Sequence, residues 1–110
     1  MDIKVSKNGD NVYLVKLSGE LDLYSSEQFK DVIMKIIVNK TERFIIDLNK
    51  IDGINSAGIG ALVSIFSTLK KLNCPLIILA AEGEALHALE VTKLKGYFSI
   101  AKSLKEALAL

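Results

Sequence analysis

The sequence predicts an α/β fold: one domain over residues 1–110, with a mixed sheet of about four or five strands and about four helices. Two observations support this prediction. Apolar runs alternate along the chain with segments whose apolar residues recur at helical spacing. Strand, helix and strand then follow one another between residues 44 and 80, which implies a right-handed crossover between two parallel strands.

The composition is that of a globular protein without a dominant charge. The 110 residues are 50% hydrophobic, and 14 Lys and Arg against 13 Asp and Glu give a formal net charge of +1. This balance gives no broad attraction to nucleic acid or to an anionic membrane, so neither is expected as a partner. The amino-terminal residues are too polar for a signal peptide, and no apolar run reaches the roughly 20 residues of a membrane span. We therefore expect a cytoplasmic protein.

The first part of the chain predicts a hairpin followed by a helix. Ile3 and Val5 alternate with polar residues, a turn cluster follows, and residues 12–17 are mostly apolar. Ser25, with Gln28 three residues later, then forms a capping-box pattern. This pattern precedes an amphipathic helix whose core-facing residues are Phe29, Val32, Ile33, Ile36 and Ile37.

The middle of the chain predicts two buried strands with a helix between them. The apolar run Phe44–Leu48 is typical of a buried strand, and we expect a short polar turn after it. A helix follows from about residue 56 to residue 72, with Ile59, Leu62, Val63 and Phe66 at helical spacing. The second apolar strand, residues 76–80, comes directly after Pro75.

The carboxyl-terminal part predicts two short helices around a brief extended segment. Gly83 precedes the first helix, which carries Leu86 and Leu89, and a turn at residues 96–98 leads into the extended segment. Ser103 and Glu106 then form another capping-box pattern before the last helix.

Ser56 lies where the predicted strand leads into the predicted helix. The first-turn N–H groups of a helix have no partner inside it, and the macrodipole adds partial positive charge there. A phosphate group would therefore be well accommodated at this position. Serine and asparagine are also favoured where a helix begins, so Asn55 and Ser56 could simply cap the helix. Spacing alone leaves both interpretations open.

A nucleophilic serine is a weaker alternative. Residues 54–58 lack the first glycine of the G-x-S-x-G elbow. His87 is the only histidine, and its place in a predicted helix is more typical of a surface or packing residue than of a general base. We therefore expect no enzymatic activity. The single Cys74 is expected to be a small buried residue, since it can form neither an intrachain disulfide nor a multi-cysteine zinc site.

The glycines around Ser56 do not match a nucleotide-binding loop. Gly53, Gly58 and Gly60 lack both the lysine of the P-loop and the spacing of the dinucleotide fingerprint. We interpret them as turn residues and as small positions where the helix start packs closely on the sheet. No cofactor is predicted.

The acidic residues of the same region do not predict a metal site. Asp47 lies inside a predicted strand, and Asp52 precedes a glycine that we interpret as a turn residue. Only Asp22, at the end of its strand, is expected to be a neighbour of Ser56. No metal is therefore predicted.

Two motifs together resemble the STAS domains of bacterial anti-sigma factor antagonists. The first is Gly19-Glu20-Leu21-Asp22 after one strand, and the second is Asn55-Ser56-Ala57-Gly58-Ile59-Gly60 after a later strand. The second motif is similar to the D-S-[ST]-G-[LI]-G signature of that family. The resemblance covers nearly the whole chain, in the order of its elements and in its size. It makes regulatory phosphorylation of Ser56 the expected role.

The resemblance implies a phosphoprotein that regulates transcription through protein–protein interaction. In that family the antagonist binds an anti-sigma factor that is also a serine kinase, and so frees a sigma factor. The kinase phosphorylates the serine and ends the association, and a phosphatase resets it. By motif, Ser56 is the acceptor and Gly58 and Gly60 are close-packing glycines. The expected partner-binding residues are Asp22, Asn55, Ser56, Ala57, Gly58, Ser64, Ser67 and Lys71.

Two positions depart from the signature. Asn55 stands where aspartate is usual, which keeps the size and the capping ability and removes a negative charge. Ala57 replaces the second hydroxyl residue, so Ser56 is the only hydroxyl of the motif. The alternative function is a STAS module that binds a nucleotide or small anion at the same helix terminus, or that scaffolds a stress-signalling complex.

Overall fold

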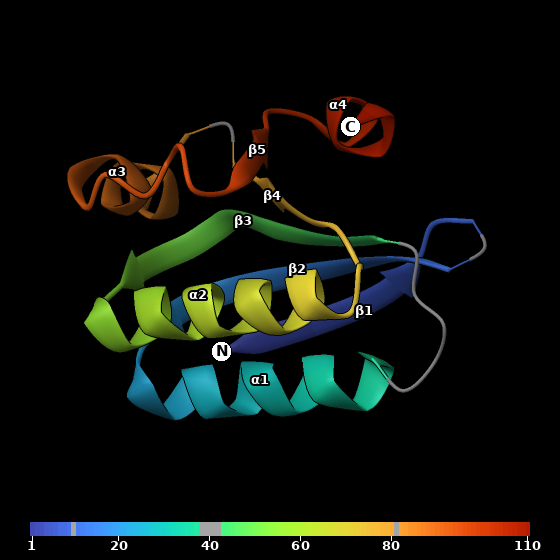
Figure 1. The fold of residues 1–110 in the computed structure, drawn as a ribbon. Helices are drawn as coiled ribbons and strands as arrows, with labels where there is room; N and C mark the ends of the chain where they lie inside the picture. The colour runs from blue at the N-terminus through green and yellow to red at the C-terminus, as the bar shows by residue number, and fades with distance from the viewer. Residues whose placement is uncertain (10, 38–42, 81) are drawn as a thin grey trace.

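The structure of the protein, a computed structural model, describes residues 1–9, 11–37, 43–80 and 82–110. Within these residues one mixed sheet has the strand order β1-β2-β3-β4-β5 (Figure 1). Strand β1 is antiparallel to β2, and the other neighbours are parallel. The strands are β1 (Asp2–Lys7), β2 (Val12–Leu21), β3 (Arg43–Ile54), β4 (Leu76–Leu79) and β5 (Ser99–Ala101).

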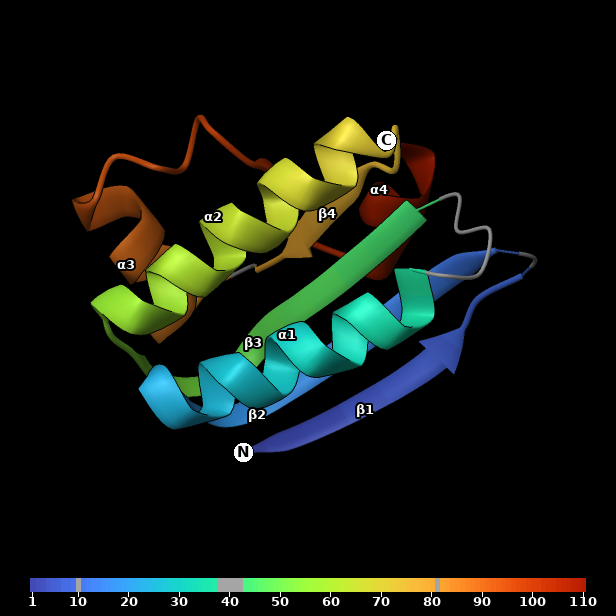
Figure 2. The same ribbon diagram turned by 60° about the horizontal axis from the view of Figure 1, so that its bottom comes forward.

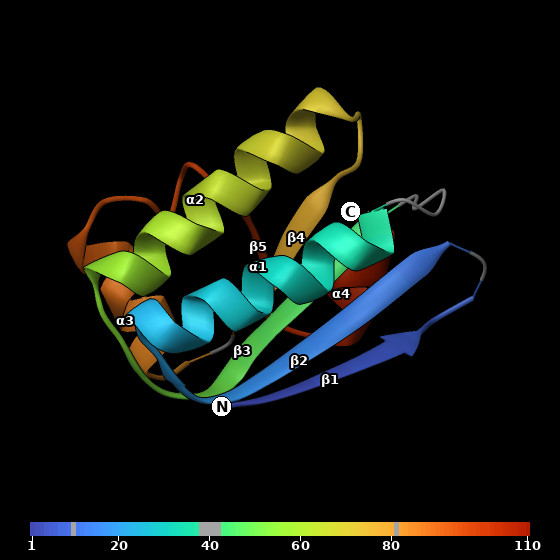
Figure 3. The same ribbon diagram turned by 90° about the horizontal axis from the view of Figure 1, so that it is seen from below.

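Helices cover both faces of the sheet. They are α1 (Leu23–Ile37), α2 (Ser56–Lys71), α3 (Glu84–Val91) and α4 (Leu104–Ala109). Helices α1 and α2 lie side by side across one face and α4 lies on the opposite face, while α3 lies beside β3 near the start of α2 (Figures 1, 2 and 3). These five strands and four helices of the described residues confirm the predicted α/β architecture.

The hydrophobic core has two parts, because the sheet is buried on both faces. The larger part lies under α1 and α2 and includes Phe29, Phe44, Leu62, Ile65 and Leu69. The smaller part lies on the other face, where residues of α4 meet β2 to β5. Its buried members are Leu14, Ile45, Ile77, Leu79, Ala101 and Ala107.

The amino-terminal hairpin forms as predicted, although Asp10 of its turn lies outside the described residues. Strand β2 runs on to Leu21, four residues beyond the predicted end. The pairing of β2 with β3 shifts register between Gly19 and Glu20, and Gly19 has a φ of 98°. This left-handed conformation favours glycine, so Gly19 lets the strand continue through an irregularity to the motif that ends at Asp22.

Strand β3 is also longer than its apolar run. The predicted polar turn after Leu48 is wrong, because β3 stays paired with β2 as far as the Leu21–Ile54 pair. Ile51 is buried inside this extension. Gly53 is therefore a strand residue, and its interpretation as a turn residue is wrong. Sheet pairing outweighs the low strand propensity of the residues around it.

Helix α1 begins three residues earlier than predicted, because its cap is Asp22 and not Ser25. Its capping residue is Asp22, whose Oδ1 accepts a hydrogen bond from the N–H of Ser25 at 3.0 Å. The Ser25 hydroxyl oxygen in turn accepts one from the N–H of Asp22 at 2.9 Å. The predicted pairing of Ser25 with Gln28 is therefore wrong. Ser25 is the third residue of the helix, where it completes a reciprocal box with Asp22.

The carboxyl-terminal elements agree with the sequence prediction. Helix α3 follows Gly83, and Ser103 caps α4 by accepting a hydrogen bond from the N–H of Glu106 at 3.1 Å. Cys74 is buried between α2 and β4, as expected. Burial raises the pKa of its thiol, because the thiolate would be poorly solvated there.

Candidate functional site

The two sequence motifs meet at one edge of the sheet. Strands β2 and β3 are parallel, so their carboxyl ends lie together, and Leu21 pairs with Ile54. The N–H of Asn55 donates a hydrogen bond to the carbonyl oxygen of Leu21 at 3.3 Å. Asp22 and Asn55 consequently line the same hollow. The structure therefore brings Asp22 next to the junction that carries Ser56.

Asn55 caps helix α2. Its side-chain oxygen accepts a hydrogen bond from the N–H of Gly58 at 3.1 Å, and its carbonyl oxygen accepts one from the N–H of Ile59 at 3.0 Å. Ser56 is the first residue of the helix and is exposed. The capping interpretation thus applies to Asn55, and the Ser56 hydroxyl is not used for it. By helix geometry the N–H groups of Ser56 and Ala57 have no intrahelical acceptor.

Gly58 fixes how closely the start of α2 approaches the sheet. A Cβ atom at Gly58 would lie 2.4 Å from the carbonyl oxygen of Leu21 and 2.8 Å from the Ile54 side chain. Gly58 is therefore a close-packing residue, and because it is buried it presents little surface to a partner. Gly60 is different, because a Cβ atom there would have no neighbour within 4 Å. The expectation that Gly60 is also a close-packing glycine is wrong.

The Asp22 carboxylate is held in place by the start of α1. Its Oδ1 lies 3.0 Å from the Ser25 backbone nitrogen and 3.1 Å from the Ser25 hydroxyl oxygen. The hydrogen bonds from the backbone N–H and the hydroxyl of Ser25 lower the pKa of the Asp22 carboxyl below its usual 3.8. The Ser25 hydroxyl also lies 2.7 Å from the carbonyl oxygen of Glu20. Asp22 is thus a charged, fixed residue beside Asn55.

Two hollows flank Asn55. The first lies along the start of α1 and is lined by Asp22, Leu23, Tyr24, Glu27, Gln28, Asp31 and Asn55. The second is a groove between the start of α2 and helix α3. It is lined by Ile54, Asn55, Ser56, Ile59, Glu84, His87, Ala88, Val91 and Thr92. Ser56 lies in the second groove and borders the first through Asn55.

The groove brings His87 to the same hollow as Ser56, which the sequence did not predict. Thirty-one positions separate the two residues, so no local spacing indicates that they meet. His87 is exposed on α3, and within the described residues no hydrogen bond joins its ring to the Ser56 hydroxyl. The described residues likewise contain no group of three or more His, Cys, Asp or Glu that could hold a metal ion.

The other expected partner-binding residues follow α2 away from this edge. Ala57, Ser64 and Ser67 are partly exposed, and Lys71, the last residue of the helix, is exposed. Fifteen residues separate Lys71 from Ser56, which corresponds to about 22 Å along a helix. The predicted partner face is therefore as long as α2 itself.

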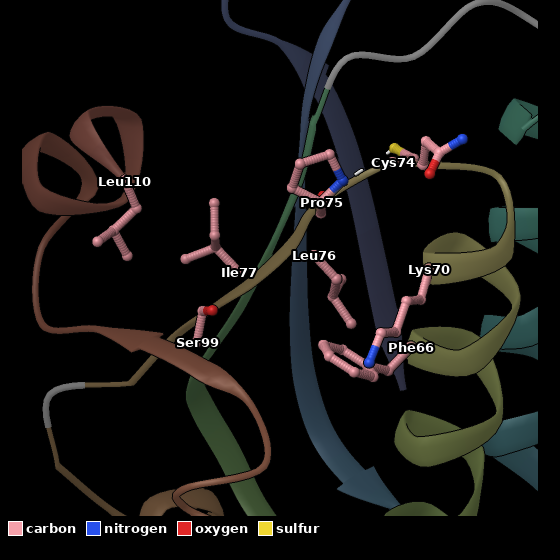
Figure 4. Close-up of a pocket in the computed structure, with 9 residues that line it drawn as sticks. Phe66, Lys70, Cys74, Pro75, Leu76, Ile77, Ser99 and Leu110 are labelled. Atoms are coloured by element: carbon pink, nitrogen blue, oxygen red, sulfur yellow. Dashed lines mark hydrogen bonds between the residues drawn. The ribbon is translucent and has the colours of Figure 1, made fainter.

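A further hollow lies at the opposite end of α2. It is lined by Phe66, Lys70, Asn73, Cys74, Pro75, Leu76, Ile77, Ser99 and Leu110. Figure 4 shows Phe66 and Lys70 pointing from α2 toward Leu76, with Ile77 and Leu110 on the other side of β4. Most of these side chains are apolar, and none belongs to the two sequence motifs.

Among the described residues, no helix is both long enough and apolar enough to cross a membrane.

Comparisons with known proteins place the fold and the motifs in one family. The model of the STAS domain family matches residues 3–107. The anti-sigma-B factor antagonist of Staphylococcus aureus is 28% identical over 86 residues, which are 78% of this chain and 80% of that protein.

Solved structures share the fold. An anti-sigma factor antagonist from Mycobacterium paratuberculosis superposes with a TM-score of 0.78 at 21% identity, covering 98% of this chain and 92% of that chain. The Bacillus cell fate determinant SpoIIAA in its phosphorylated form gives a TM-score of 0.75 at 18% identity, covering 98% and 97%. At these identities the structures establish a common fold.

Proposed function

This chain belongs to the STAS domain family, and we propose that it is an anti-sigma factor antagonist whose binding is ended by phosphorylation of Ser56. Its partner is an anti-sigma factor with serine kinase activity, and a phosphatase that acts on phosphorylated Ser56 restores binding. The protein is a cytoplasmic regulator of bacterial transcription and not an enzyme. The kinase supplies the metal ion and the base of the transfer, so the antagonist needs only an accessible hydroxyl.

One observation supports this proposal above the others. Ser56 is exposed at the first residue of α2, while the neighbouring Asn55 does the capping. Burial of Gly58 against Leu21 holds the backbone of this turn in one position. The Ser56 hydroxyl is therefore presented in a defined place without a structural task of its own. Ser25 and Ser26, by contrast, are buried and would be poor acceptors.

The names of related proteins also support the proposal. The relative in Staphylococcus aureus is named as an anti-sigma-B factor antagonist, and a protein of the same fold has been solved in a phosphorylated form. We propose the same antagonist role for this chain. We also propose that it is phosphorylated at Ser56, the one hydroxyl residue of its Asn55–Gly60 motif.

The chemistry of the site explains how a phosphoryl group could end binding without unfolding the domain. A phosphoserine carries about −1.5 to −2 charge at neutral pH. In the free protein, the unpaired N–H groups at the start of α2 and the helix dipole stabilise that charge. In a complex, the same charge would have to lose its water, which costs several kcal/mol unless the partner pairs it.

The proposal is tested first by identifying the partner and the acceptor. Capture with the tagged protein from source cells, followed by mass spectrometry, should recover an anti-sigma factor with a kinase domain. Incubation of the purified pair with ATP should then place phosphate on Ser56. Substantial phosphate on Ser25, Ser26 or Ser64 in the Ser56→Ala variant would contradict the assignment. Binding of the nucleotide by this chain alone would favour the small-anion function.

The charge-blocking mechanism is tested with Ser56→Asp. We expect this variant to be as stable as wild type or more stable by about 0.3–1 kcal/mol, because a carboxylate in the first helical turn is favourable. Its affinity for the partner should be lost or greatly weakened, while Ser56→Ala should still bind. Thermal unfolding and calorimetric titration measure the two effects separately. Weak binding that only accompanies a large loss of stability would instead show that Ser56 is structural.

A further inference from the structure

The three most exposed large hydrophobic side chains of the described residues all lie around Ser56. Tyr24 is 85% exposed, Leu23 is 68% exposed and Val91 is 65% exposed. Leu23 and Tyr24 line the hollow along the start of α1, and Val91 lines the groove that contains Ser56. Next in exposure is Leu72, at the other end of α2. The three highest exposed fractions among the large hydrophobic side chains therefore occur at the edge that carries the proposed switch.

The local structure explains why Leu23 and Tyr24 point away from the core. Helix α1 buries one side through Phe29 and Ile33, and Ser25 and Ser26 occupy that side in the first turn. Tyr24, Glu27 and Asp31 are spaced by three, four and seven residues, so they share the opposite, solvent-facing side. All three are exposed. Asp22 fixes the first turn through its bonds with Ser25, so the ring of Tyr24 projects from a rigid support.

The surroundings of Tyr24 are acidic. Asp22, Glu27 and Asp31 line its hollow, and no described Lys or Arg does. The neighbouring groove adds Glu84 and is likewise without a described Lys or Arg. An exposed aromatic residue inside an acidic rim complements an apolar pocket bordered by cations.

We propose that Leu23, Tyr24, Glu27 and Asp31, together called the Tyr24 patch, form the main anchor for the anti-sigma factor. This inference rests on the proposed function and specifies the partner surface: an apolar pocket that takes the Tyr24 ring, bordered by Lys or Arg side chains that face Glu27 and Asp31. Tyrosine is enriched among the residues that dominate binding energy, because it buries a large rigid ring and keeps a polar end. The patch adjoins Asn55, so one partner surface covers both the anchor and Ser56.

This arrangement also gives the phosphoryl group its effect. Because Asn55 lines both hollows, a partner surface that covers Tyr24 and extends past Asn55 also covers the groove that contains Ser56. A phosphoryl group on Ser56 would therefore lie inside the buried area. The Tyr24 patch supplies binding affinity on one side of Asn55. Phosphorylation of Ser56, on the other side, abolishes that affinity.

The test compares Tyr24→Ala with three matched variants, using the anti-sigma factor purified after its capture from source cells. Tyr24→Ala should weaken calorimetric affinity by about 30-fold or more, the loss typical of a dominant interface residue. Tyr24→Phe keeps the ring and should stay within about threefold of wild type. Leu72→Ala removes an exposed apolar side chain at the far end of α2 and should have no effect. Glu27→Gln combined with Asp31→Asn should slow association at low salt and flatten its salt dependence.

The outcomes separate this inference from the function on which it rests. If wild type does not bind the anti-sigma factor, both are overturned. If wild type binds and Ser56→Asp does not, while Tyr24→Ala binds like wild type, only the anchor is overturned. If the wild-type chain forms dimers that Tyr24→Ala abolishes, the patch is a contact between two copies and the inference is wrong. Unchanged melting temperatures in all variants show that the fold is intact, since the substituted side chains are exposed.

Discussion

The two ends of helix α2 are held in different ways. At the first turn, polar contacts and a close backbone approach fix the chain: Asn55 caps the helix and Gly58 packs on Leu21. In the later turns, apolar side-chain packing holds the helix in place. The ring of Phe66 lies 4.9 Å from that of Tyr97 and 5.2 Å from that of Phe98, measured between centroids.

This difference shows how one end of the helix can carry a switch. The core residues Leu62, Ile65 and Leu69 hold the helix on the sheet along its length. The first turn therefore does not need the side chain of Ser56 for stability. A charge can be added there at little cost to folding, because the groups that fix the turn are Asn55 and Gly58.

The largest expected effect tests the close approach at the first turn. Gly58→Ala should destabilise the protein by about 3 kcal/mol, because its Cβ would clash with backbone and not with a flexible side chain. Gly60→Ala is the matched control two residues later. It should stabilise the helix by about 0.5–1 kcal/mol, since its Cβ meets nothing and alanine is the better helix former. Urea unfolding measures both, and equal effects would contradict the packing described for Gly58.

A smaller effect concerns the pH dependence of the turn beside it. The folded protein lowers the pKa of Asp22 below 3.8 by hydrogen bonds from Ser25, so the ionised carboxyl favours folding. This contribution is present above pH 3.8 and is lost as the pH falls through 3.8 and then through the lower folded value. Wild type should therefore be more stable than Asp22→Asn near neutral pH, and the difference should shrink in acid.

Unfolding curves of both proteins between pH 2 and pH 7 check this expectation. Ser25→Ala removes the hydroxyl donor and should reduce the pH dependence of wild type without removing it, because the backbone N–H of Ser25 still bonds to Asp22. A pH-independent difference between wild type and Asp22→Asn would contradict the account.

The smallest expected effect lies at the far end of α2. Lys71→Glu should weaken partner binding by about threefold, the size typical of an exposed charge at the rim of an interface, and should change stability little. Lys105→Glu, an exposed charge reversal on α4 and so on the other side of the sheet, should leave affinity unchanged. If Lys71→Glu binds the partner as tightly as Lys105→Glu, Lys71 does not contact the partner. The interface would then include only α1 and the first turns of α2.

The sequence alone determined the α/β class, the order of the elements and the place of Ser56. Apolar periodicity and turn residues are local signals, and they are strong for long elements such as α2. The Asn55–Gly60 motif is local too, because the capping residue Asn55 and the hydroxyl of Ser56 lie within six consecutive residues. The local signals failed in two places. At the end of β3, pairing with β2 extended the strand past its apolar run. At the start of α1, Asp22 caps the helix in place of Ser25, three residues later in the sequence.

Only the tertiary structure decided what surrounds Ser56. The Leu21–Ile54 pairing brings the Asp22 turn beside Asn55, and helix α3 brings His87 and Val91 to the same groove. The exposure of Tyr24 likewise became apparent only in the structure. Whether a side chain is buried depends on which elements pack against it, and parallel pairing between distant strands sets that packing.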